Sequence, residues 1–205
     1  MHLLITGAAG FIGSHFAREH VRAYPSDTVV VLDKLTYAAD RTYLDPVADR
    51  ITFIAGDIAD PVLVPEILKK YTIDAIVNFA AETHVDRSID DPSPFLHTNV
   101  LGVQNLLNAC RVFPEIRFLH ISTDEVYGDL QDTDAPKTTI DPLRPSSPYA
   151  ASKASGDLLV QAAARTYGIK AAISRCTNNF GPHQAGEKFI PTVIRCALSD
   201  QQVPI

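Results

Sequence analysis

The stretch Thr6-Gly7-Ala8-Ala9-Gly10-Phe11-Ile12-Gly13 decides the fold, because it joins a short apolar run to an amphipathic pattern. Residues 3–6 predict a buried β-strand, and residues 12–23 predict the helix that follows. Glycines in such a turn allow a tight reversal, the close approach of a pyrophosphate and close packing of the helix on the strand. A pyrophosphate there would face free N–H groups at the helix N-terminus. The stretch therefore predicts a dinucleotide site.

The same alternation of apolar run and helical pattern continues along the chain. It predicts a Rossmann-type α/β fold, a doubly wound parallel sheet with right-handed crossovers. Asp60-Pro61, Asp91-Pro92 and Ser147-Pro148 each predict an N-cap followed by the first helical residue, and Gly168 predicts a helix end. The further strands are expected at 28–32, 51–55, 75–79, 117–121 and 171–175, and the further helices at 62–71, 95–113, 148–167 and 190–198.

The ends of the second, third and fourth predicted strands carry residues suited to a cofactor. Asp33 follows Gly13 by twenty positions, where a carboxylate can accept hydrogen bonds from both ribose hydroxyls and repel a 2′-phosphate. This favours NAD over NADP, although the adjacent Lys34 weakens the preference. Asp57-Ile58 lies where an adenine could sit, with a plain loop before a helix as the alternative, and Asn78-Phe79-Ala80-Ala81 offers small residues for close approach.

Two further segments carry groups for redox and proton-transfer chemistry. Tyr149 and Lys153 are four residues apart and share one face of a helix, so the lysine can stabilise a phenolate that acts as a base. Such a pair alone is common on helix surfaces, but the dinucleotide turn makes a catalytic interpretation the better one. Thr123 could orient a substrate hydroxyl, and Asp124 and Glu125 offer an acid and a base beside it. The constellation predicts an enzyme that oxidises an alcohol and moves protons at neighbouring carbons.

Composition excludes several other classes of protein. The chain has 205 residues, 46% hydrophobic content and a net charge of −6, so we expect neither nucleic acid nor anionic lipid as a partner. Three widely spaced cysteines and seven histidines without a ligand pattern indicate neither a disulfide framework nor a metal site. The N-terminus lacks the pattern of a signal peptide and no apolar run reaches membrane-spanning length, so the cytoplasm is expected.

At these residues the chain resembles the extended short-chain dehydrogenases/reductases, also described as the NAD-dependent epimerase/dehydratase family. Within them it is most similar to the dTDP-glucose 4,6-dehydratases. Relatives that only epimerise usually carry small or hydroxyl residues at the Thr-Asp-Glu triplet, so the triplet is the specific feature. The matching segments are 6–13, 33–38, 80–89, 122–129, 147–155 and 178–182, and they run over nearly the whole chain.

The resemblance implies a reaction and a role for each group. Tyr149 would take the proton from the sugar 4-hydroxyl while hydride leaves C4 for NAD. Glu125 would then remove the hydrogen on C5, Asp124 in its acid form would donate to the departing 6-hydroxyl, and the hydride would return to C6. The implied substrate is a nucleoside-diphosphate glucose, dTDP-glucose above all, and the product a 4-keto-6-deoxy sugar nucleotide. Such chemistry requires two carboxyl groups with different pKa values.

The resemblance also implies the binding residues. Phe180, His183 and Phe189 depart from its usual pattern, which bears on fine substrate choice rather than reaction type. Cofactor contacts are implied or predicted at Gly7, Gly10, Phe11, Ile12, Gly13, Asp33, Lys34, Leu35, Thr36, Asp57, Ile58, Phe79, Ala80, Ala81, Thr83, Thr98, Tyr149, Lys153 and Asn179. Substrate contacts are expected at Thr83, Asp86, Thr123, Asn178, Lys188 and Phe189.

The last part of the chain suggests a second unit. Residues 1–178 are expected to form the NAD-binding domain, and 179–205 to begin a smaller nucleotide-sugar-binding lobe that looks truncated, because the family continues beyond this point. The family usually forms a homodimer through helices that correspond here to 95–113 and 148–167, although packing within one subunit explains their small residues equally well. Two alternatives remain open: a nucleotide-sugar epimerase or reductase that leaves Asp124 and Glu125 idle, and a non-catalytic NAD-binding scaffold.

Overall fold

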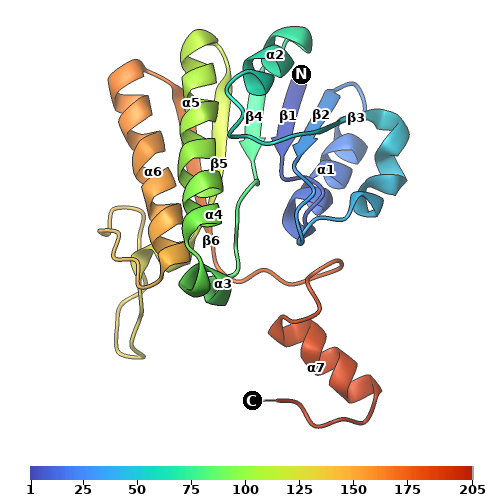
Figure 1. Ribbon diagram of the computed structural model, residues 1–205, viewed down its shortest axis with the longest axis vertical. Helices are drawn as coiled ribbons and strands as arrows, with labels where there is room; N and C mark the ends of the chain where they lie inside the picture. Colours follow the sequence, from blue (N-terminus) through green and yellow to red (C-terminus); the bar gives the residue numbers. More distant parts are fainter. Residues whose placement is uncertain (205) are drawn as a thin grey trace.

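The computed structural model describes residues 1–204 and contains one six-stranded sheet with helices on both faces (Figure 1). All strands are parallel, in the order β3-β2-β1-β4-β5-β6, which is the order of a doubly wound dinucleotide-binding fold. This confirms the predicted fold class. The strands are β1 (His2–Thr6), β2 (Thr28–Asp33), β3 (Ile51–Ala55), β4 (Ala75–Asn78), β5 (Arg117–Thr123) and β6 (Lys170–Cys176).

The helices alternate with the strands as the sequence pattern predicts. The α-helices are α1 (Phe11–Ala23), α2 (Leu63–Lys70), α3 (Val85–Asp90), α4 (Ser93–Phe95), α5 (Val103–Val112), α6 (Pro148–Tyr167) and α7 (Phe189–Leu198). Three tighter or wider segments join them: the 3-10 helices η1 (Arg41–Arg50) and η3 (Asp124–Tyr127), and the π-helix η2 (Leu96–Gly102).

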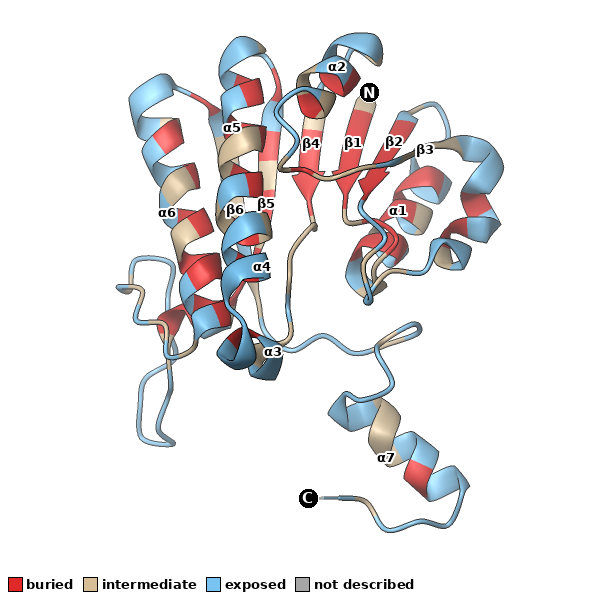
Figure 2. Ribbon diagram, viewed as in Figure 1, coloured by how far each residue is buried: buried red, intermediate tan, exposed pale blue. Residues whose placement is uncertain are grey.

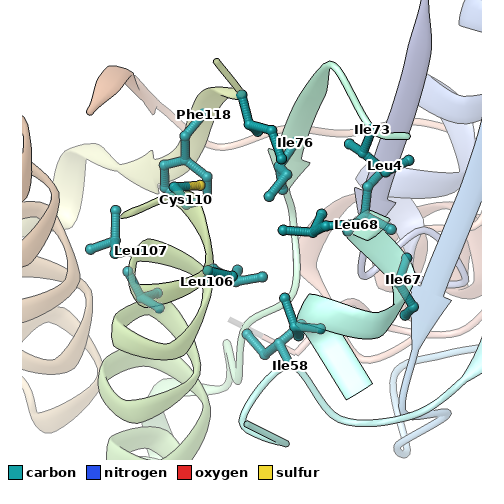
Figure 3. Close-up of a cluster of buried hydrophobic side chains, with 14 of the residues drawn as sticks. Leu4, Ile58, Ile67, Leu68, Ile73, Ile76, Leu106, Leu107, Cys110 and Phe118 are labelled. Carbon is teal, nitrogen blue, oxygen red and sulfur yellow. The ribbon is translucent and has the colours of Figure 1, made fainter. Parts of the chain in front are cut away.

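The sheet separates two hydrophobic cores because successive side chains of a strand point to opposite faces. Leu4 of β1 packs with α2, α5 and α6, in the cluster shown in Figure 3. Leu3 and Ile5 pack on the other face, with α1 and η1. The inner strands β1 and β2 are buried almost throughout, whereas the edge strand β6 alternates between partly buried and exposed residues. Burial on both faces is therefore found at the centre of the sheet, whereas the edge strands β3 and β6 are only partly buried.

Three helix predictions need correction. The helix expected at 95–113 is not uniform: it runs through α4, η2 and α5, and the wide turn of η2 carries the buried side chain of Asn99. The helix expected from Pro61 begins at Leu63, because Asp60 accepts hydrogen bonds from the backbone N–H groups of Val62 and Leu63. The helix expected from Pro92 likewise begins one residue later, at Ser93, whose N–H donates to the side chain of Asp91. Ser147 is a true N-cap, and Gly168 ends α6 in the left-handed conformation.

Beyond β6 the chain leaves the sheet. Residues 177–188 cross below its carboxyl edge, and α7 stands clear of both helical layers (Figure 1). Figure 2 shows α7 as mostly exposed, in contrast to the strands. Among residues 1–204, no helix combines the length and the apolarity that crossing a membrane requires.

Candidate active site

The glycine-rich turn joins the carboxyl end of β1 to α1. Gly7 has a φ of +69°, and a Cβ atom there would lie 2.5 Å from the backbone nitrogen of Ala80, at the end of β4. Gly13 packs against the backbone of Gly7 and Ala8 so closely that a Cβ would clash. The turn thus has the tight reversal and the close helix packing that the sequence predicts. Phe11 and Ile12, the first residues of α1, lie at the same edge of the sheet.

The N-terminus of α1 is open to a ligand. Gly10 is the N-cap and provides no side chain, and the first turn contains no acidic residue. The first N–H groups of the helix therefore have no side-chain acceptor, and they carry the partial positive charge of the helix dipole. This end of α1 fits a pyrophosphate.

Asp33 is fixed in position beside the turn. It is 7% exposed, and its two carboxylate oxygens accept from the backbone N–H groups of Ala9 and Leu35, each at 2.8 Å. Burial raises the pKa of Asp33, and these two hydrogen bonds oppose the rise. Each oxygen keeps a further lone pair, so the carboxylate can still accept hydroxyl groups of a ribose. Together with α1, this arrangement fits a dinucleotide.

Other residues proposed for the cofactor surround this edge. Lys34 forms an ion pair with Asp57 at 2.6 Å, and His97 contacts the same carboxylate oxygen at 3.2 Å. Lys34 is thus turned toward the end of β3, and its charge is paired. Its effect against the preference for NAD is therefore smaller than its position in the sequence suggests. Asp57 has a lowered pKa: burial raises it, but Lys34 and the N–H of Ala59 outweigh that effect. Ile58 is buried in the core beneath α5, so its side chain does not face this edge.

Tyr149 and Lys153 lie on α6 as predicted, and both are buried, at 7% and 3% exposure. Ser88 of α3 accepts from the Tyr149 N–H at 3.0 Å, and the phenol ring meets Phe95 edge to face. The Lys153 ammonium donates to the carbonyl of Ile121 at 2.7 Å. Burial lowers the pKa of Lys153 to about 8, although Asp157 and Cys176 oppose that effect.

The predicted acid and base follow β5 on η3. The hydroxyl of Thr123 accepts from the N–H of Glu125 at 3.2 Å, which caps the 3-10 turn, and donates to Asp124 at 3.3 Å. Partial burial raises the pKa of Glu125, the charge of Asp124 raises it further, and the charge of Lys188 lowers it. Lys188 therefore lies near enough to Glu125 to affect its pKa, although the two residues are far apart in sequence.

The phenol and the carboxylates form one electrostatic group. Burial raises the pKa of Tyr149, and the charges of Glu125 and Asp124 add to the rise, while a hydrogen bond with Thr123 lowers it. The structure thus brings together the predicted residues 123, 124, 125 and 149, with Lys153 one turn further along α6. In this arrangement Tyr149 is a protonated phenol, and removal of its proton requires additional positive charge nearby.

Asn99 is part of the site and was not predicted. Its amide donates to the carbonyl of Glu82 and to the hydroxyl of Ser152, both at 2.9 Å, and its oxygen accepts from the N–H of Glu82 at 3.0 Å. Ser152 in turn donates to the carbonyl of Tyr149 at 2.7 Å. Asn99 thus links the segment after β4 to α6. An asparagine inside a predicted helix is a weak signal, because asparagine is more often exposed than buried.

The remaining predicted residues lie along the same edge but are less enclosed. Asn178, Asn179, Lys188 and Phe189 are exposed on the segment that leads to α7. His183 stacks on Tyr43 with ring centroids 4.1 Å apart and accepts from Arg18 at 2.8 Å, so the segment reaches back to α1 and η1. Thr83 and Asp86 are exposed, Thr36 and Thr98 are half-buried, and Ala80 and Ala81 are half-buried beyond β4 with Phe79.

Comparison with known proteins identifies relatives over the whole chain. The family model for GDP-mannose 4,6 dehydratase matches residues 4–204. A dTDP-glucose 4,6-dehydratase of Mycobacterium tuberculosis is 51% identical over 203 residues, which are 98% of this chain and 60% of that protein. One from Streptomyces niveus is 47% identical over 100% of this chain and 62% of its own length. The chain therefore spans about 60% of the length of these curated relatives.

Solved structures agree with this likeness. DesIV, a dTDP-glucose 4,6-dehydratase from Streptomyces venezuelae crystallised with NAD and TYD, superposes with a TM-score of 0.93 at 49% identity, covering 100% of this chain and 64% of that one. A UDP-glucose 4-epimerase of Thermus thermophilus with NAD gives 0.87 at 31% identity, over 99% of this chain and 64% of that one. By fold, site and sequence, this chain belongs to the GDP-mannose 4,6 dehydratase family.

Proposed function

We propose that this chain is the NAD-binding and catalytic part of a nucleoside-diphosphate-glucose 4,6-dehydratase, a lyase whose substrate is dTDP-glucose. The observation that carries the proposal is the position of Asp124 and Glu125, which follow Thr123 directly and raise the pKa of Tyr149 by their charge. An alcohol dehydrogenase needs only the phenol and the lysine. Two carboxyl groups beside them serve an elimination, which needs both a base and an acid.

The chain's own groups divide the proton transfers between them. Tyr149 accepts the proton of the sugar 4-hydroxyl, which Thr123 orients. Glu125 takes the proton from C5, and a carboxylate whose pKa is raised is the stronger base when ionised. Asp124 in its acid form donates to the departing 6-hydroxyl. Bound NAD supplies the hydride acceptor for C4 and the hydride donor for C6.

The surroundings of Tyr149 disfavour the loss of its proton. Its pKa is raised by burial and by two carboxylates, so a cation has to favour the phenolate. Lys153 supplies one positive charge on the same helix face, and the oxidised cofactor, when bound, would supply another. We therefore expect Tyr149 to become an effective base only in the complex with the oxidised cofactor.

The cofactor and substrate residues named from the sequence complete the proposal. The turn from Gly7 to Gly13 holds the pyrophosphate and Asp33 the adenosine ribose, supported by the open end of α1. Residues 179–205 begin the nucleotide-sugar-binding lobe. In support, α7 stands off the sheet and exposes Ile194 and Leu198, beside an apolar hollow of about 740 Å³ lined by Phe180, Ile190 and their neighbours.

A homodimer in the cytoplasm belongs to the same proposal. Leu101 on η2 and Leu158 on α6 are 59% and 55% exposed, and large apolar side chains on adjoining helices suit a helical interface. Sedimentation of the wild-type chain and of Leu158→Glu tests this. A concentration-dependent dimer that the charged variant abolishes supports the interface, and identical monomers contradict it.

Mass spectrometry of the product tests the reaction. The protein is incubated with NAD and either dTDP-glucose or UDP-glucose, and the proposal predicts loss of one water from dTDP-glucose. We expect slow turnover and ordinary NAD binding by the 205-residue chain. Titration calorimetry with NAD separates cofactor binding from turnover. Binding without product leaves the cofactor assignment intact, whereas absence of binding contradicts the whole proposal.

A nucleotide-sugar epimerase is the second candidate, supported by the likeness to the Thermus thermophilus enzyme. It would use Thr123, Tyr149 and Lys153 and leave the two carboxyl groups without a role. A product of unchanged mass but altered sugar configuration would favour it. A non-catalytic scaffold would give neither product, in spite of the assembled catalytic groups.

A further inference from the structure

A row of buried polar side chains runs under the carboxyl edge of the sheet. The hydroxyl of Thr6, at the end of β1, donates to the amide oxygen of Asn78 on β4. The amide nitrogen of Asn78 lies 3.0 Å from Nδ1 of His120 on β5. Asn78 and His120 are at most 1% exposed. The row links three neighbouring strands, and it ends beside α6.

These contacts fix the protonation of His120. Because the amide donates to Nδ1, the imidazole carries its hydrogen on Nε2. Burial and the charge of Lys153 hold the pKa of His120 well below its usual range, so the ring is neutral. Its Nε2 has no hydrogen-bond partner and lies 3.8 Å from Oδ1 of Asp157, which has none either. A buried donor thus faces a buried acceptor.

Asp157 is the carboxylate on which this cluster converges. It is fully buried on α6, and its Oδ2 accepts from Nε of Arg175 on β6 at 2.7 Å. Arg175 also donates to the phenol of Tyr127 on η3 at 2.7 Å. Asp157 follows Lys153 by one helical turn, where side chains are neighbours. The buried carboxylate is therefore paired with Arg175 on β6 and lies one helical turn from Lys153.

We propose that Asp157 is a positioning residue that keeps Lys153 protonated, with neutral His120 facing the carboxylate from the other side. The consequence for chemistry rests on the proposed function of Tyr149 and Lys153. A buried ammonium whose hydrogen bond goes to one backbone carbonyl needs a counter-charge to stay charged. Without Asp157, Lys153 would be a neutral amine at working pH and could no longer favour the phenolate.

The charges around Lys153 define the sign of the effect. Asp157 and Tyr149 face it on α6, Cys176 and Arg175 lie on β6, and His120 lies on β5. Burial lowers the pKa of Lys153, and Asp157 is the foremost opposing influence. Removing only this negative charge must lower the pKa further. A purely structural role predicts the opposite: loosened packing would admit water and return the pKa toward its ordinary value.

The test measures the pKa of Lys153 directly. Lysine is labelled with ¹³C at Cε, the Lys153 signal is assigned by its loss in Lys153→Met, and its shift is followed with pH. Asp157→Asn should lower the pKa by about one unit or more. Arg175→Gln removes the cation paired with Asp157 but leaves the Asp157 carboxylate in place. This variant should raise the pKa of Lys153. An unchanged or raised pKa in Asp157→Asn overturns the proposal.

Folding controls keep the comparison interpretable. Circular dichroism and thermal unfolding accompany each variant. If Asp157→Asn does not fold, Arg175→Gln is measured alone at an unchanged unfolding midpoint, and a constant or lowered pKa overturns the proposal. The titration needs no substrate or cofactor, so it remains decisive if dehydration fails. In a turnover assay, Asp157→Asn should move the alkaline loss of activity to lower pH by the same amount.

Discussion

Gly7 and Ala80 are in such close backbone contact that no side chain fits between them. A Cβ on Gly7 would lie 2.5 Å from the Ala80 nitrogen. Gly7 belongs to the turn that would cradle the cofactor, and Ala80 begins the segment that Asn99 fastens to η2. The contact therefore sets the distance between the pyrophosphate turn and the segment next to the reacting groups.

A pair of glycine variants separates close approach from backbone strain. Gly7 and Gly168 both have a φ of +69°, but a Cβ on Gly168 would meet nothing within 4 Å. Gly168→Ala should therefore cost only the left-handed backbone, about 1–2 kcal/mol of unfolding free energy. Gly7→Ala adds a collision with backbone, and we expect a loss of about 3 kcal/mol or more. Denaturant unfolding measures both, and equal losses would contradict the close contact.

Asp33 should govern the affinity for NAD. Asp33→Asn removes the charge and part of the accepting capacity, and hydrogen bonds to charged groups contribute about 1.5–3 kcal/mol. We expect NAD binding to weaken roughly 10–100-fold by calorimetry, with a smaller change for NADP, since the repulsion of a 2′-phosphate is also removed.

Lys34→Met is the matched control for that measurement. Lys34 is paired with Asp57, so its removal should leave the preference for NAD over NADP largely unchanged. If Lys34→Met changes the preference more than Asp33→Asn does, the assignment of Asp33 to the ribose is wrong.

Much of this architecture could be predicted from sequence because local patterns determine it. The glycine turn between an apolar run and an amphipathic pattern fixed the first βα unit, and the Ser147-Pro148 pair marked the start of α6. Strand ends gave the position of Asp33 and Thr123, because ligand-binding residues gather at the carboxyl edge of a parallel sheet.

The parts that could not be predicted depend on distant partners. Asn99 lies on the buried face of the helical segment with Phe95 and Val103, but sequence favours a solvated asparagine over a buried one. Asp157 and Arg175 are eighteen residues apart and meet across a helix–strand packing. A charged residue within a helical pattern is more often solvated than buried, so sequence favours the wrong environment for Asp157.

Lys153 should leave a signature in the pH dependence of stability. Its pKa is about 8 in the folded chain against an ordinary 10.5, so between these values the unfolded state binds the extra proton. Stability from this group therefore rises with pH across that window, on the order of 3 kcal/mol in total. The free energy of unfolding of the wild type should therefore rise relative to that of Lys153→Met as the pH increases from about 8 to 10.5. A difference that does not vary with pH would show that Lys153 titrates normally.

Asn99 should stabilise the fold as well as the site. Asn99→Ala leaves the half-buried N–H and carbonyl of Glu82 without their partner, and we expect a loss of about 2–3 kcal/mol in unfolding free energy. Asn105 also donates to two carbonyls, those of Ile58 and Asp60, but Asn105 is only half-buried, whereas Asn99 is 1% exposed. Asn105→Ala should therefore lose less unfolding free energy than Asn99→Ala. An equal loss in the two variants would contradict a special stabilising role for the Asn99–Glu82 hydrogen bonds.

Glu125 offers the sharpest division between oxidation and elimination. Glu125→Gln keeps the shape of the side chain but cannot accept a proton, so hydride transfer from C4 should persist while water loss stops. In a single turnover, the absorbance of NADH should rise and remain, and the sugar nucleotide should be lighter than the substrate by two hydrogens, without loss of water. Asp124→Asn is the matched control: it retains the base at C5 and should slow departure of the 6-hydroxyl instead.

In wild type, the rate of elimination should fall as the pH is lowered, and the midpoint of this fall should lie above the usual range for a glutamate, because the pKa of Glu125 is raised. Equal loss of hydride transfer and elimination in Glu125→Gln would mean that this carboxylate shapes the site without acting as its base.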